Sequence, residues 1–427
     1  MQRDHTNAGD SSGELLSYWQ KTSTHPSLST DLPRDIDVAV IGGGLLGVST
    51  CYWLARAGVE VALLERTALV HGATGRNGGF VTVGTAEPYA DALTRLGRET
   101  SRDVLTLTIE NKALVGQVVA EEGIACHYRE PGNLELALSE TQLAGLKRTT
   151  EALRADGLPA MLLDRTQAQE FVNTPLGPEI VGGKFLPGLG LVHSAKLILG
   201  VAEAAQRYGA RMYQATALRL EAIENGVLIH TSAGIMQSGA VVVALNAWTS
   251  ELLPVLDEVI VPVRGQVVAY APVAPVFPTG MQARVSSTGE YWQQTVDGSI
   301  VLGGGRAVEY RNGMGIKEIR LTEEVQAAIE QVFPRLFPAL SGLKVAQRWA
   351  GLMAFTPDYI PVADRVPDVP GAWVVGGFSG FGMPFGLRLG QLLATAVTNG
   401  DAPAQLQPFR LARPTLQRKE NENLRRQ

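Results

Sequence analysis

The chain has 427 residues, which is too many for one hydrophobic core, so we expect two domains. With 45% hydrophobic and 19% charged residues, the composition is that of an ordinary globular protein. A net charge of −5 and a pI near 5.8 argue against a nucleic-acid-binding protein, which normally carries a basic surface.

The first elements form the beginning of a βαβ unit. Residues 37–41 are a short apolar run that ends in glycines, as a buried parallel strand does. A helix is expected from about Leu46 to Ala57, because Gly58 then supplies a normal C-terminal stop. A second strand follows at residues 59–64, and the three elements together are typical of a dinucleotide-binding domain.

The middle of the chain alternates helical and extended patterns. Residues 90–122 are expected to be helical, with one apolar face made of Leu93, Leu96, Leu105, Ile109 and Leu114. Further helices are expected at 140–155 and 197–208, and further strands at 133–138, 211–220 and 241–245.

The pattern in the last part of the chain predicts a second sheet, followed by a strand and a helix that belong to the first domain. Short β runs at 261–269, 291–295 and 299–302 alternate with turns, which predicts an antiparallel sheet with one wet face. A buried strand at 373–375 and a helix at 387–397 follow.

The predicted fold class is therefore α/β (α+β overall), with a Rossmann-like dinucleotide domain and an interleaved antiparallel-sheet domain. The dinucleotide domain is expected to be discontinuous, comprising residues 35–125, 190–252 and 345–405. The second domain takes 126–189 and 253–344. An N-terminal extension (1–34) and a C-terminal tail (406–427) complete the chain.

Cysteine, histidine and hydropathy patterns exclude several other classes. Cys51 and Cys126 are far apart, and no histidines have metal-ligand spacing, so we predict no metal site and a reducing, cytoplasmic setting. No run of about 18 apolar residues predicts a membrane span, although peripheral attachment remains open. Residues 1–34 are polar and contain no apolar stretch of a secretory signal.

The strongest motif lies between the first strand and the first helix. Residues 42–47 read GGGLLG and satisfy the dinucleotide fingerprint GxGxxG. Gly42 permits the tight turn, Gly44 lets the backbone approach a pyrophosphate, and Gly47 allows the helix to pack on the strand. Glu65 ends the second strand where a carboxylate binds ribose hydroxyls, which disfavours NADP but does not separate NAD from FAD.

Two further glycine-rich loops favour a flavin. Residues 71–80, HGATGRNGGF, lack bulky side chains where a backbone would cross a flat ring system. Residues 376–382, GGFSGFG, follow a buried strand and precede the last helix, whose N–H dipoles would face a ring that gains negative charge on reduction.

With these stretches the chain resembles the D-amino acid oxidase superfamily of flavoproteins. The similarity is to the branch with monomeric sarcosine oxidase, glycine oxidase and gamma-glutamylputrescine oxidase, and it extends over nearly the whole chain from about Tyr18. The matching stretches are 37–47, 61–66, 72–80, 193–199, 241–248, 348–361 and 373–390.

The resemblance implies FAD and the oxidation of a C–N bond. A neutral amine would donate hydride from its α-carbon to flavin N5, and the imine formed would hydrolyse. No essential base is needed, and the catalytic residues remain unknown. Oxygen or another acceptor would take the electrons. The implied flavin contacts are Gly42, Gly44, Leu45, Leu46, Gly47, Glu65, Arg66, Gly72, Ala73, Thr74, Asn77, Gly78, Gly79, Ala217, Ala244, Asn246, Gly377, Phe378, Ser379, Gly380, Phe381, Gly382 and Met383.

The chain departs from the family at positions that matter chemically. Met353 stands where sarcosine oxidases have a flavin-linked cysteine, and Asn77 stands where other relatives have a flavin-linked histidine. We therefore expect non-covalent FAD. Phe381 and Pro384 replace a histidine and a lysine, and that lysine helps to hold a small substrate carboxylate.

The substrate contacts are less well defined by the sequence. Arg264, Arg306 and Arg348 are possible carboxylate partners, although a structural role explains each as well. Candidates for lining the substrate site are Phe80, Tyr291, Arg306, Trp349 and Phe381. His193 opens the segment that precedes the helix at 197–208, and a catalytic role for it is a minor alternative.

Other functions share the N-terminal fingerprint. A flavin monooxygenase would show a Gly-Asp motif for the ribityl chain late in the sequence, and residues 373–382 contain none. A D-amino acid dehydrogenase with a non-oxygen acceptor and an accessory flavin subunit of a larger complex also remain open, as does the oligomeric state.

Overall fold

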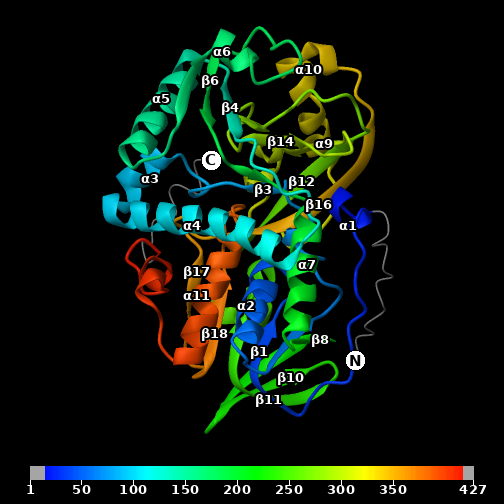
Figure 1. Ribbon diagram of the computed structural model, residues 1–427, viewed down its shortest axis with the longest axis vertical. Coiled ribbons are helices and arrows are strands. Elements are labelled where there is room, and N and C mark those ends of the chain that lie inside the picture. The colour runs from blue at the N-terminus through cyan, green and yellow to red at the C-terminus, as the bar shows by residue number, and fades with distance from the viewer. Residues whose placement is uncertain (1–14, 417–427) are drawn as a thin grey trace.

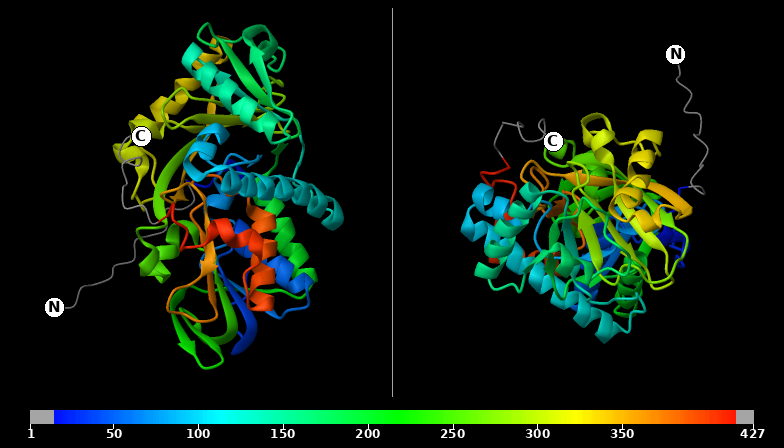
Figure 2. Two further views of the ribbon diagram at one scale, coloured as in Figure 1. Left: turned by 90° about the vertical axis from the view of Figure 1, so that its left-hand side faces the viewer. Right: turned by 90° about the horizontal axis from the view of Figure 1, so that it is seen from above.

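The computed structural model describes residues 15–416, which form two large sheets stacked along the long axis of the molecule (Figures 1 and 2). The first sheet has the order β17-β18-β11-β1-β2-β8, with the hairpin β9–β10 joined to β11. Its strands are β1 (Asp35–Ile41), β2 (Val61–Glu65), β8 (Arg211–Gln214), β9 (Ala217–Ile223), β10 (Gly226–Thr231), β11 (Gly234–Val243), β17 (Val362–Arg365) and β18 (Ala372–Gly376).

The core of this sheet is parallel, because β1 pairs in parallel with both β2 and β11. Helices cover one face: α2 (Leu45–Arg56), α7 (Ser194–Arg207), α11 (Gly386–Asn399) and, across their ends, α4 (Arg98–Glu122) (Figure 1). The helices α2 and α11 approach closely, since a Cβ on Gly390 would lie 2.2 Å from Ser49 Oγ. Parallel strands covered on both faces read as continuous apolar runs, as residues 38–41 do.

The second sheet has the order β16-β12-β15-β14-β13-β4-β6-β5. Its strands are β4 (Asn133–Ala137), β5 (Met161–Asp164), β6 (Gly182–Leu186), β12 (Val261–Tyr270), β13 (Gly280–Ala283), β14 (Glu290–Gln294), β15 (Ile300–Gly304) and β16 (Val345–Phe355). The helices of this half are α5 (Glu140–Ala155), α6 (Arg165–Gln169), α9 (Glu323–Glu330) and α10 (Val332–Leu336). A short ribbon of β3 (Phe80–Val81) and β7 (Gly190–Leu191) lies between the halves.

Several expectations about this second half need correction. The sheet is not wholly antiparallel, because β4 pairs in parallel with β13. Its central strands are not wet on one face either, since β12, β14 and β15 are mostly buried and α9 and α10 cover them. The strand β16, which we assigned to the dinucleotide domain, pairs with β12 and belongs to the second sheet.

The helical stretch at 90–122 is two helices, α3 (Tyr89–Leu96) and α4. Gly97, with φ of 81°, breaks it, because that backbone conformation cannot continue a helix. Ile109 was expected on the apolar face but is 38% exposed. The expected strand at 211–220 is also divided, into β8 and β9.

The described parts of both termini pack on the body of the protein, contrary to the expected extension and tail. The helix α1 (Tyr18–Lys21) contains Trp19, which is 1% exposed. At the other end, Leu406 and Phe409 are fully buried, and Arg413 Nε lies 2.7 Å from Asp358 Oδ2. No helix within residues 15–416 has the length and apolar character that a membrane crossing requires.

Candidate active site

A cavity of about 970 Å³ lies between the two sheets. We call its lower side, made of loops at the carboxyl ends of the first sheet's strands, the floor. We call its upper side, made of the second sheet, the roof. The volume is near the upper end of the roughly 300–1,000 Å³ found for small-molecule sites, so the cavity can hold a large ligand.

The centre of the floor is the turn from β1 into α2. Gly42 has φ of 115°, and a Cβ there would lie 2.6 Å from Ala244 O. A Cβ on Gly47 would lie 1.8 Å from Gly42 O, so only glycine fits at either position. Gly44 lies open to the cavity and precedes the first turn of α2, whose N–H groups favour an anion.

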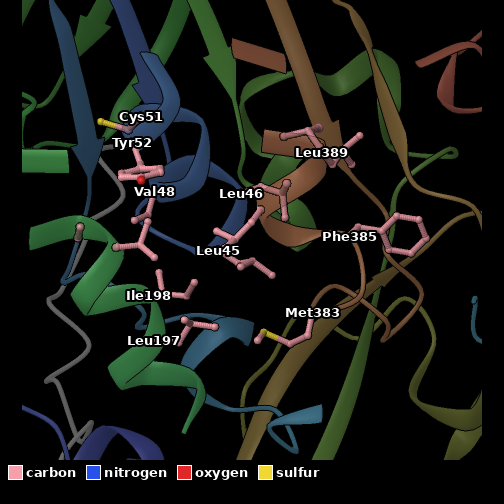
Figure 3. Packing of buried hydrophobic residues seen from close by; sticks show 14 of the residues in the cluster. Leu45, Leu46, Val48, Cys51, Tyr52, Leu197, Ile198, Met383, Phe385 and Leu389 are labelled. Atoms are coloured by element: carbon pink, nitrogen blue, oxygen red, sulfur yellow. The ribbon is translucent and has the colours of Figure 1, made fainter. Parts of the chain in front are cut away.

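The first turn of α2 lies between two other helices. Leu45 and Leu46 lie between Ile198 of α7 and the segment with Phe385 that leads into α11 (Figure 3). This packing fixes the direction in which the helix N-terminus points.

Glu65 lies at the end of β2 beside this turn. Its Oε2 accepts a hydrogen bond of 2.8 Å from Gly43 N, and its Oε1 accepts one of 2.9 Å from Thr67 N. The next residue, Arg66, pairs with Glu251 at 3.2 Å and lies over the Trp248 ring. The carboxylate is therefore held at the edge of the floor, where the sequence predicts a ribose.

The loop at residues 72–79 crosses the floor and is tied to α2. Thr74 Oγ1 accepts a hydrogen bond of 2.9 Å from Leu45 N. Asn77 stabilises the loop itself, since its Nδ2 donates to Thr74 O and its Oδ1 accepts from Gly79 N. A Cβ on Gly78 would lie 2.7 Å from Tyr291 Cε2, so the roof presses directly on this loop.

The third loop completes the floor beside β18. Asn246, with φ of 46°, accepts a hydrogen bond of 3.1 Å from Gly377 N, which joins the ends of β11 and β18. Ser379 also has a positive φ, 51°, and its N–H donates to Ala354 O of β16. A Cβ on Gly380 would lie 3.2 Å from Met353 Sδ, so Met353 borders this loop.

The roof is a row of side chains from adjacent strands. Lys184, Glu135, Gln282 and Tyr291 are successive cross-strand neighbours on β6, β4, β13 and β14, and all four line the cavity. Lys184 Nζ and Glu135 Oε2 are 2.7 Å apart, and both side chains are 13% exposed. Burial raises the pKa of Tyr291 to about 12, so its phenol stays protonated at neutral pH.

Arg306 enters the cavity from the turn after β15. Its guanidinium lies 5.2 Å from the centre of the Phe355 ring, and its Nη1 donates to Asn312 O at 3.3 Å. Burial lowers its pKa. An arginine remains charged at neutral pH even so. No ion pair of Arg306 with an acidic side chain is found within residues 15–416.

Most of the predicted site residues line this cavity, but some do not. Trp349 is fully buried in the core, where its indole donates to Arg76 O. Gly47 and Gly377 lie behind the cavity wall, where they permit close packing. The predicted residues that line the cavity are Gly42, Gly44, Leu45, Leu46, Glu65, Arg66, Gly72, Ala73, Thr74, Asn77, Gly78, Gly79, Phe80, Ala217, Ala244, Asn246, Tyr291, Arg306, Phe378, Ser379, Gly380, Phe381, Gly382 and Met383.

Two of the three candidate arginines are used elsewhere. Arg264 is 2% exposed and pairs with Glu309, so its charge is neutralised inside the protein. Arg348 pairs with Glu330 at 2.7 Å, outside the cavity. Only Arg306 of the three lines the cavity.

His193 has a structural position. Its Nδ1 accepts from Lys196 N and caps α7, while its Nε2 lies 2.8 Å from Thr22 Oγ1. Burial and the nearby charges of Lys196 and His127 lower its pKa to about 3, so the ring is neutral. It does not line the cavity. In the described residues, no group of three metal-ligating side chains could hold a metal ion.

Comparison with known proteins agrees with the family, fold and cofactor that the sequence predicts. The sequence profile of the family described as "FAD dependent oxidoreductase" (DAO) matches residues 37–396. The chain belongs to the DAO family of FAD-dependent oxidoreductases. The family resemblance inferred from the sequence is therefore confirmed, and so are the α/β fold and the expected FAD.

Two relatives and one solved structure are similar to this DAO-family chain over most of its length. It is 27% identical to the probable oxidoreductase OrdL of Rhizobium meliloti (strain 1021), over 84% of this chain and 82% of that protein. It is 25% identical to the gamma-glutamylputrescine oxidoreductase of Escherichia coli (strain K12), over 86% and 84%. The structure of glycine oxidase from Geobacillus kaustophilus has the same fold, with a TM-score of 0.77, 23% identity, and coverage of 89% and 99%.

The floor fits the cofactor of the DAO family. Its glycines leave room where FAD must approach the backbone, and α2 presents an N-terminus for a pyrophosphate. Gly72 and Gly78 line the cavity, and neither N–H has a hydrogen-bond partner within the described residues. Such donors suit a ligand that is rich in acceptor atoms.

Sequence reasoning missed the residues that hold the floor loops from behind. Arg76 is 7% exposed and donates to His71 O, Leu15 O and Ala350 O. Asn111 of α4 is fully buried and bonds to Met383 O and Arg388 N. Apart from the bond between Arg76 and His71 O, these side chains bond to backbone groups that are distant in sequence, so no local motif marks them.

Proposed function

We propose that this chain oxidises the C–N bond of an amine or N-substituted amino acid. The observation that carries the proposal is the cavity that joins a floor suited to FAD with a roof from which Arg306 enters, an arginine with no ion pair to an acidic side chain within residues 15–416. Relatives named gamma-glutamylputrescine oxidoreductase and glycine oxidase support an amine or amino acid as the substrate class.

The chain's residues would act mainly by binding and orientation. FAD, when bound, supplies the two-electron acceptor. Arg306 would hold a substrate carboxylate, and the protonated phenol of Tyr291 would donate a hydrogen bond beside it. Burial between the two sheets lowers the pKa of a bound amine, which keeps it neutral and able to release hydride.

The loop at the end of the floor favours a substrate with an apolar arm. Phe381, Met383 and Pro384 all line the cavity, and none of them can replace the lysine that related sarcosine oxidases use. That missing contact would contribute roughly 1.5–3 kcal/mol. Burying about 100 Å² of an apolar arm would contribute about 2.5 kcal/mol, which offsets the loss.

An anaerobic flavin-reduction screen tests the proposal. We expect amines and N-alkyl amino acids to bleach the flavin, and bulky, partly apolar compounds to react faster than sarcosine or glycine. If no amine reduces the flavin, the chain is an accessory flavin subunit or a different oxidoreductase. If sarcosine or glycine has the highest second-order rate constant of the series, the inference about the apolar arm is wrong. Reoxidation of reduced protein by oxygen then separates an oxidase from a dehydrogenase.

We further propose that FAD is held without a covalent bond. Met353 borders Gly380 where related enzymes attach the flavin to cysteine, and a thioether cannot form that link. Asn77 is at the other attachment position, where its amide bonds to the loop backbone. Acid precipitation should therefore release all the yellow colour to the supernatant. Flavin that stays with the precipitated protein would refute this.

A further inference from the structure

The segment at residues 17–22, which we call the N-terminal strap, lies outside the part of the chain that the family profile matches. It contains α1, which lies beside the end of α7 and near β16 (Figure 1). Ser17, Trp19 and Gln20 are 0%, 1% and 4% exposed, so all three side chains are buried. A capping box between Ser17 and Gln20 closes the short helix.

The side chains of Ser17, Trp19 and Gln20 donate hydrogen bonds to the floor loop at residues 72–79 and to the two residues just before it. Trp19 Nε1 donates to Asn77 O at 2.5 Å, and Ser17 Oγ donates to Gly75 O. Gln20 Nε2 donates to Val70 O at 3.3 Å and to His71 O at 3.1 Å. The strap therefore satisfies four carbonyl groups on the side of the loop that faces away from the cavity.

These bonds determine which way the loop's N–H groups point. In a trans peptide, the C=O of one residue and the N–H of the next point in opposite directions. Because His71 O and Asn77 O face the strap, the N–H groups of Gly72 and Gly78 face away from it. Both glycines line the cavity, and neither N–H has a hydrogen-bond partner within residues 15–416.

The strap is itself anchored to both halves of the protein. Gln347 of β16 donates to the carbonyl of Leu16, the residue just before the strap, and Nε2 of His193, at the start of α7, lies 2.8 Å from Thr22 Oγ1. The Trp19 ring also packs edge-on against His193, with the ring centres 5.0 Å apart. A support fixed at several points can hold the loop in one orientation.

We propose that Trp19 and Gln20 are positioning residues for the flavin. By holding His71 O and Asn77 O, they direct the N–H groups of Gly72 and Gly78 at the bound cofactor. The strap thus preorganises the cofactor site from outside the dinucleotide motif, and it acts through the loop without touching the flavin.

The test is a Trp19→Phe variant, which keeps the aromatic packing and removes the indole donor. Trp53→Phe is a matched control, because Trp53 Nε1 also donates to a backbone carbonyl, Leu387 O at 3.1 Å, but this bond joins α2 to α11 and does not involve the floor loop at residues 72–79. We expect Trp19→Phe to raise the FAD dissociation constant of the apoprotein about 3- to 10-fold and to shift the visible spectrum of bound flavin. Trp53→Phe should change neither the FAD dissociation constant nor the visible spectrum of the bound flavin.

A second variant keeps the test informative if Trp19→Phe does not fold. Gln20→Met preserves the length of the side chain and removes its donor, so it should weaken FAD binding in the same direction. The melting temperature of each apoprotein separates positioning from general stability. If Trp19→Phe and Gln20→Met bind FAD as tightly as Trp53→Phe, the proposal is overturned, whatever the change in melting temperature. None of these measurements needs a substrate, so they are independent of the proposed reaction.

Discussion

The floor of the cavity is shaped by backbone, whereas its roof is shaped by side chains. On the floor, a Cβ on Gly42 or Gly47 would lie 2.6 Å or 1.8 Å from a carbonyl oxygen. On the roof, Lys184, Glu135 and Gln282 are neighbours only because the strands β6, β4 and β13 pair in that register. At these glycines the floor excludes almost any substitution. The shape and charge of the roof instead depend on which side chain each strand presents.

This difference suits the two ligands. A cofactor that is the same in every member of a family can be bound by a backbone that leaves no room for variation. A substrate that differs between members needs a surface that can change without disturbing the sheet. Positions such as Arg306, on a turn after β15, allow that change because the strand pairing does not involve their side chains.

The largest effect should come from filling the space at the floor. In Gly47→Ala the new Cβ would meet the backbone of Gly42, which cannot move aside as a side chain can. We expect a loss of about 3 kcal/mol in stability. The protein should also lose its ability to retain FAD. Gly342→Ala is the control, since nothing lies within 4 Å of that position and its φ is not positive. Equal melting temperatures for the two variants would show that the floor is more adaptable than its geometry implies.

The difference between floor and roof also explains which parts of the site could be predicted from the sequence. The glycines within each floor loop are close together in the chain, so the turn after β1, the start of α2 and Glu65 were recognisable from spacing alone. The roof was not, because strand register over eight strands is not encoded locally. The apolar run of β16 predicted a buried strand but not the sheet to which it belongs. Trp19 and Gln20 follow no pattern, because their partners are carbonyl groups 50 or more residues away.

A smaller effect is expected on the roof, and it should depend on the substrate. Arg306→Met keeps an apolar side chain against Phe355 and removes the charge. For substrates with a carboxylate, we expect kcat/KM to fall roughly 10- to 150-fold, which corresponds to one charge-assisted hydrogen bond. Amines without a carboxylate should react nearly as before. Arg348 pairs with Glu330 outside the cavity, so Arg348→Met is the control. It should leave kcat/KM unchanged for substrates with a carboxylate and for those without one. A similar loss for both substrate types would mean that Arg306 shapes the cavity and does not bind carboxylate.

The smallest effect tests whether side-chain charge also matters on the floor. Glu65 lies at the edge of the cavity, where its carboxylate accepts from Gly43 N and Thr67 N. A charge-assisted hydrogen bond to a ribose would contribute roughly 1.5–3 kcal/mol. Glu65→Ala should therefore weaken FAD binding roughly 10- to 100-fold. The cavity floor should remain folded, since the contacts that shape it involve glycine backbone.

Glu65→Gln sharpens this test, because it keeps the side-chain shape and an oxygen that can accept from Gly43 N. We expect its FAD dissociation constant to lie between those of the wild type and Glu65→Ala, since only the charge is lost. Glu60→Ala removes an exposed carboxylate just before β2 and serves as the control. Titration of each apoprotein with FAD measures the effect directly. If Glu65→Ala and Glu60→Ala bind FAD equally well, Glu65 does not hold the ribose, and the floor recognises the cofactor through its backbone alone.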